Sequence, residues 1–159
     1  MSTSTVMVVS RLEARHLADL VGQFASLVEE SDARDPAVER LTPDAYPDDA
    51  DANAQFRGLA RSDLLGRRAT DAGSVLATLL PVSSSTEPSP AHDDDLVELA
   101  LDADAVGAWM RTLAAIRLVL ASRLGIESEE DRDEDDPRFG VYDWIGYRLE
   151  GLLQATDPG

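Results

Sequence analysis

Clustered carboxylates are the first candidates for chemistry in this sequence, because they are the side chains that bind divalent cations. Aspartates alternate along residues 131–135, as they do at the start of a calcium-binding loop. Such a loop needs glycine at its sixth position and glutamate at its twelfth, and Asp136 and Tyr142 stand there instead. The run Asp93–Asp95 beside His92 is better interpreted as an acidic surface loop than as a loose ion site. We therefore expect no metal site.

Patterns typical of catalytic residues are missing from the rest of the chain. The two histidines, His16 and His92, do not stand in an H-E-x-x-H arrangement, and no serine lies in a G-x-S-x-G turn. There is no cysteine for thiol chemistry and no lysine for a Walker A loop or a Schiff base. The sequence therefore predicts no catalytic residue, no cofactor and no enzymatic activity.

Arg117 is the single residue that most strongly suggests binding. It lies three positions before Leu120, at the edge of an apolar helical stripe, where an arginine must extend to solvent or meet a carboxylate. Asp143 is the candidate partner, and an ion pair tying two helices together is the favoured interpretation. The alternative is contact with a ligand or a protein partner by Arg117, Asp143, Trp109 and Tyr142.

Composition and charge restrict the classes of function. The 159 residues include 31 acidic side chains and 14 basic ones, all arginine, which gives a formal net charge of −17. Nonspecific nucleic-acid affinity comes from basic side chains that neutralise phosphates, so direct binding to DNA or RNA is not expected. No apolar run approaches the roughly 18 residues of a membrane span and no signal peptide is visible, so we expect a cytoplasmic protein without membrane contact.

The elements that position these residues follow from hydrophobic periodicity. A β-branched strand at 5–9 precedes a helix at about 11–31, with Ser10 and Glu13 spaced as a capping box. After a proline-rich connector, a short helix from Pro47 to about Leu59 is expected. A further helix is capped by Ser62 or Asp63 and ended by Pro81.

The second half repeats the order of strand and helix. Residues 81–95 predict a flexible loop, 96–101 a strand, and 103–124 a helix capped by Asp102 and closed by Gly125. An acidic linker at about 127–137 precedes the last helix, at about 138–155. The prediction is a mainly α fold: one domain over residues 1–159, a helical bundle of about five helices with a small two-stranded β ribbon.

Seven segments form a recognisable pattern: 35–46, Phe56-Arg57, Leu101-Asp102, Ala108-Trp109, 116–120, 123–125 and 141–145. They resemble an actinobacterial family known as a domain of unknown function, which includes the oxidative-stress regulator AosR. The resemblance spans nearly the whole chain, and it implies a non-enzymatic regulatory role with a sigma factor in the response to oxidants. A thiol pair cannot sense redox state here, because the chain has no cysteine.

Together these observations predict a regulatory or adaptor protein that acts through protein–protein contacts. The negative charge is compatible with a basic partner such as a sigma factor or an RNA polymerase surface. A small-molecule-binding domain or an enzyme with a pocket near Arg117 is the alternative, which a deep pocket with convergent polar groups would favour. A homodimer through the C-terminal helices is a third hypothesis.

Overall fold

A computed structural model describes residues 5–30, 41, 50–83, 93–125 and 138–156. Within these ranges the chain forms helices and one two-stranded antiparallel sheet, which confirms the mainly helical expectation. The described residues contain four helices rather than about five. The elements are β1 (Thr5–Ser10), α1 (Arg11–Glu29), α3 (Ala50–Ser83), β2 (Leu96–Leu101), α4 (Ala103–Leu124) and α5 (Arg138–Thr156).

Both strands expected from the sequence are present, and they pair with each other. Thr5 faces Leu101 and Ser10 faces Leu96, so the strands are aligned over their whole length. Successive side chains point to opposite faces of a strand. One face of the sheet therefore enters the core, where Met7 and Leu99 are buried, while the other faces outward.

The start of α1 is fixed by the predicted cap. The Ser10 hydroxyl accepts a hydrogen bond from the Glu13 backbone N–H at 3.0 Å, which satisfies one of the free donors of the first turn. The backbone N–H groups of Arg11 and Leu12 donate to the carbonyls of Asp95 and Asp93, at 2.9 and 3.1 Å. The segment before β2 therefore helps to hold the first turn of α1.

One long helix, α3, replaces the two helices expected between Pro47 and Pro81. Helix formers surround Gly58 and Ser62, so the helix continues through both positions. The glycine costs about 1 kcal/mol relative to alanine, which is too little to interrupt the helix, and Ser62 does not begin a new one. Pro81 does not end it either: it lies inside the helix, two residues before the last one, so little helix follows the position that it disturbs. The loop expected at 81–95 thus begins later: Pro81 is helical, and residues 84–92 lie outside the described ranges.

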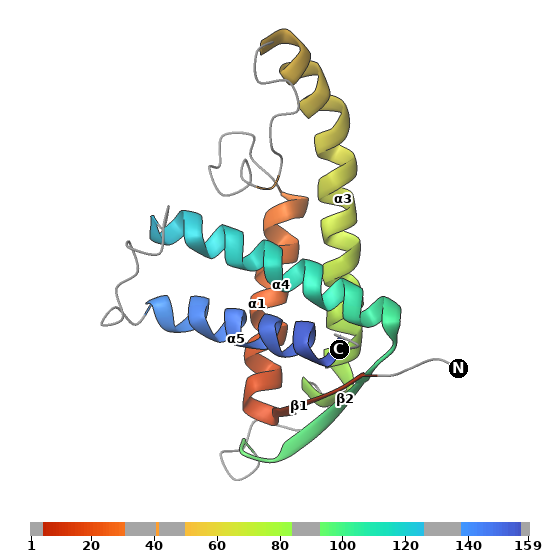
Figure 1. Ribbon diagram of the computed structural model, residues 1–159, viewed down its shortest axis with the longest axis vertical. Helices are drawn as coiled ribbons and strands as arrows, with labels where there is room; N and C mark the ends of the chain where they lie inside the picture. Colours follow the sequence, from red (N-terminus) through yellow and green to blue (C-terminus); the bar gives the residue numbers. More distant parts are fainter. Residues whose placement is uncertain (1–4, 31–40, 42–49, 84–92, 126–137, 157–159) are drawn as a thin grey trace.

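The core lies where the helices meet. Figure 1 shows α1 and α3 running side by side, with α4 and α5 crossing them. One apolar cluster joins all four helices to the inner face of the sheet. Helix α4 lies between α3 and α5, and it contributes Trp109, Leu113 and Ile116 to the cluster.

Helix α4 also has both predicted ends. The Asp102 carboxylate accepts from the Ala105 N–H at 2.8 Å, and Gly125 takes the left-handed conformation, with φ of 73°.

Helix α4 is the one helix of the described residues long and apolar enough to span a bilayer. Half of its most apolar stretch is buried inside the protein, as in the core helix of a soluble protein.

Candidate binding surfaces

Trp109, one of the four candidate contact residues, lies in the core between α3 and α4. Its ring is fully buried, and its Nε1–H donates to the Thr78 hydroxyl at 2.9 Å. The Thr78 hydroxyl in turn donates to the Val75 carbonyl at 2.7 Å. A satisfied indole N–H at full burial is the arrangement expected of a packing residue.

Arg117 and Tyr142 are brought together where α4 meets α5. The Arg117 guanidinium carbon lies 4.2 Å from the centroid of the Tyr142 ring, which is a cation–π contact. The Nε of Arg117 is buried without a hydrogen-bond partner. Asp143 is half-buried and has an interaction partner of its own. The two helices are therefore tied by Arg117, with an aromatic ring as its observed neighbour.

Glu13 makes the contacts that the sequence did not predict. Its carboxylate accepts from the Trp144 Nε1–H at 2.8 Å and pairs with two nitrogens of the Arg148 guanidinium. The capping-box pattern predicted that Glu13 would bond back to the backbone of Ser10. Its side chain instead joins α1 to α5, over 130 residues away in sequence.

The acidic run before β2 is engaged in the structure. Asp93 pairs with Arg15, and Asp95 lies 3.8 Å from the Arg11 Nε. Among the described residues there is no group of three or more histidine, aspartate or glutamate side chains placed to hold a metal ion. The run 131–135 and His92 lie outside the described ranges.

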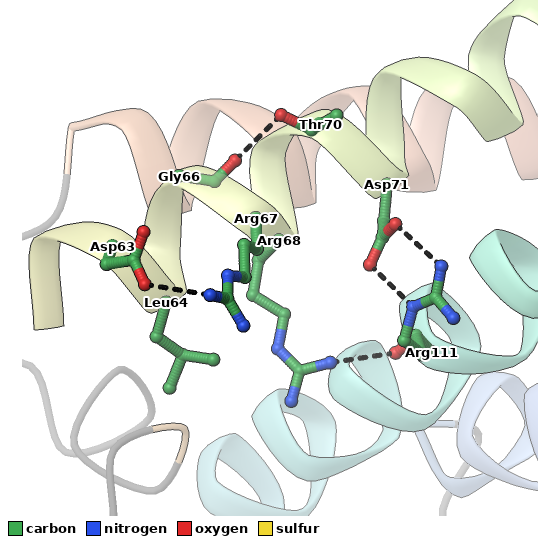
Figure 2. A pocket seen from close by; sticks show the side chains of 8 residues that line it. All are labelled: Asp63, Leu64, Gly66, Arg67, Arg68, Thr70, Asp71 and Arg111. Atoms are coloured by element: carbon green, nitrogen blue, oxygen red, sulfur yellow. Dashed lines mark hydrogen bonds and ion pairs between the residues drawn. The ribbon is translucent and has the colours of Figure 1, made fainter. Parts of the chain in front are cut away.

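Three arginines gather at an open hollow of about 880 Å³ between α3 and α4. Figure 2 shows Arg67 and Arg68 extending from α3, Arg111 rising from α4, and two aspartates on α3. Arg111 donates to both carboxylate oxygens of Asp71, at 2.9 and 3.0 Å. An exposed pair joins Arg67 to Asp63 at 3.1 Å.

Arg111 and Arg68 differ in how well their charges are compensated. Hydrogen bonding to Asp71 raises the pKa of Arg111 above the usual arginine value against the opposing effect of burial, and the charges of Asp71 and Asp104 act in the same direction. Among the described residues, Arg68 donates only to the Arg111 backbone carbonyl, at 3.5 Å, and its Nε is buried without a partner. Sequence periodicity could not find this hollow, because Asp71 and Arg111 are 40 positions apart.

The outward face of the two-stranded sheet is a second surface feature, and we call it the ribbon face. The solvent side of an antiparallel sheet is normally polar. Here it carries Val6 (52% exposed), Val8 (43%) and Leu96 (73%), with Glu98 opposite Val8. A groove of about 400 Å³ separates β1 from α5 beside it.

Comparison with known proteins gives one match. A family model described as a domain of unknown function (DUF2017) matches residues 2–156, almost the full length of the chain. Neither the curated proteins nor the solved structures include a match to this sequence.

Proposed function

The chain belongs to the DUF2017 family, and from that premise we propose that it is a non-enzymatic regulatory or adaptor protein that acts through protein–protein contacts. The ribbon face is the observation that carries this proposal. Three large apolar side chains, Val6, Val8 and Leu96, are exposed together on a sheet whose other face is in the core. Grouped exposed apolar side chains with a charged border are characteristic of protein-binding surfaces.

The border of the ribbon face is acidic and indicates the chemistry of the partner. Asp94 and Asp95 are exposed just before β2, and Asp102 and Asp104 just after it. We call these four residues the acidic rim. Strand β1 has no charged side chain, and the chain between Asp93 and Met110 has no basic residue. The complementary partner is a protein with an apolar contact residue surrounded by lysines and arginines.

A sigma factor or an RNA polymerase surface is the partner we propose, in the transcriptional response to oxidants. The resemblance to the family that includes AosR supports this choice. A basic surface on a sigma factor or RNA polymerase would also complement the acidic rim. Because the chain has no cysteine, it does not sense oxidants through a thiol. Its role is to bind a component whose activity changes under oxidative stress.

Site-specific photocrosslinking in cells tests the proposal. A photoreactive amino acid is placed at Val8 or, as a matched control, at Leu118 on α4, which is also 43% exposed. We expect Val8 to give a discrete adduct with a sigma factor or polymerase subunit that Leu118 does not give. An adduct with a different protein rejects the transcription partner, and an adduct between two copies of the chain favours the homodimer. Equal labelling at both positions contradicts the ribbon face as a binding surface.

A binding measurement with the identified partner provides the second test. Val8→Glu places a charge in the centre of the ribbon face without disturbing the core, so it should weaken binding at least tenfold, equivalent to about 1.4 kcal/mol. Leu118→Glu should leave the dissociation constant unchanged. Equal affinities of the two variants would reject the role of the ribbon face.

A further inference from the structure

We propose that the hollow between α3 and α4 binds a small oxyanion, a phosphate or carboxylate group carried by a small molecule, with Arg68 as the main contact. This inference is independent of the ribbon face, which belongs to other elements. It depends on the charges that converge in Figure 2 and on the incomplete pairing of one of them.

The charges that line the hollow do not balance. Three arginines face two aspartates there, in a chain whose overall charge is strongly negative. Asp71 has both oxygens occupied by Arg111, and Asp63 is paired with Arg67. Arg68 has no ion pair with any described residue and contributes the unbalanced positive charge.

The donors of Arg68 are also largely unused. A guanidinium has five N–H donors, and within the described part of the chain Arg68 uses one of them, in a long hydrogen bond of 3.5 Å. Its Nε is buried and has no hydrogen-bond partner among the described residues. A buried polar group without a partner is unfavourable, and an oxyanion at the two terminal nitrogens would stabilise the charge.

The position of Arg68 makes those terminal nitrogens accessible. Its side chain extends from α3 toward α4, as Figure 2 shows, and Arg67 lines the same hollow. The hollow is open to solvent, and its volume of about 880 Å³ is in the range of small-molecule sites. Arg67 can contribute a second donor, because its pair with Asp63 is largely exposed and therefore weak.

A titration with defined anions tests the site. Backbone amide NMR shifts of residues 66–70 and 111 are followed on adding pyrophosphate or citrate, with chloride at equal ionic strength as the blank. We expect a saturable shift confined to these residues, with a dissociation constant of about 1 mM or tighter. The tighter of the two anions identifies phosphate or carboxylate as the natural group. A shift that does not saturate, or one equal to the shift with chloride, would overturn the proposal.

Variants of Arg68 connect the titration to the proposed contact. Arg68→Gln should weaken binding about tenfold or more, since it removes a charge-assisted hydrogen bond. Arg68→Lys keeps the charge but loses the planar fork, and it should have intermediate affinity. Arg123→Gln, on the exposed last turn of α4, is the control and should bind as the parent chain does. Equal weakening by Arg68→Gln and Arg123→Gln would show that net charge, not the hollow, determines binding.

Discussion

Glu13 occupies the first turn of α1 and accepts hydrogen bonds from two side chains of α5. Replacing it with alanine leaves the half-buried Trp144 N–H and Arg148 guanidinium without their carboxylate partner. The free energy of unfolding should therefore fall by about 2–3 kcal/mol, as expected when one member of a partly buried pair is lost. Urea denaturation measures the change. Glu150→Ala, at an exposed site on α5, is the control and should cost less than about 0.5 kcal/mol. Similar losses in both variants would contradict the role of Glu13.

Two threonines, Thr78 on α3 and Thr112 on α4, should respond in opposite ways to the same substitution. Thr112 is fully buried and its hydroxyl has no partner, whereas the Thr78 hydroxyl accepts from Trp109. Thr112→Val should stabilise the protein by about 1 kcal/mol, and Thr78→Val should destabilise it by about 1–2 kcal/mol. Thermal unfolding of both variants checks the prediction. The same sign for the two changes would show that the hydroxyl environments are wrongly described.

Local sequence rules identified the residues whose partners are near in the chain. Ser10, Asp102 and Gly125 were predicted as caps, and all three have the expected geometry. Glu13 and Arg68 were not predicted as contacts, because their surroundings depend on helices that meet only in the folded chain. Arg117 lies between these two cases. Its position at the edge of the apolar stripe predicted a contact with the last helix, and the residue that it contacts there is Tyr142.

At the scale of elements, periodicity predicted which segments form helices better than it predicted where they end. Both strands and the helices α1, α4 and α5 were located to within a few residues. The expected break between Gly58 and Ser62 was wrong. A glycine or a capping residue interrupts a helix only when the chain on one side gains more by leaving it, and here both sides are good helix formers.

Alanine substitutions at two helical glycines should distinguish the effect of helix propensity on stability from the effect of close packing. A Cβ at Gly73 of α3 meets no atom within 4 Å, while one at Gly146 of α5 lies 3.0 Å from the Arg117 Nε. Gly73→Ala should raise the free energy of unfolding by about 0.5–1 kcal/mol through backbone entropy alone. Gly146→Ala should gain less or be destabilising, because Arg117 must shift on the Tyr142 ring. Equal gains in urea denaturation would contradict the close contact of α4 with α5.

For the molecule as a whole, the charge of −17 acts on stability and on binding in opposite directions. Repulsion among the excess carboxylates destabilises the compact state, and salt screens that repulsion over roughly 10 Å at 0.1 M. The urea midpoint should therefore rise between low and physiological ionic strength. The association rate with a basic partner should fall over the same range, because salt also screens the attraction that steers the partner to the acidic rim.

The two salt dependences can be measured on the same samples, by urea denaturation and by stopped-flow association. Neutralising Asp94 and Asp104 of the acidic rim to asparagine removes part of both effects. The salt dependence of association should become shallower, while the helix caps at Ser10 and Asp102 stay intact. Neutralising Glu29 and Glu30, which are exposed at the far end of α1, changes the net charge equally and is the matched control. If both double variants alter association to the same degree, the partner responds to total charge, and the acidic rim has no special part in recognition.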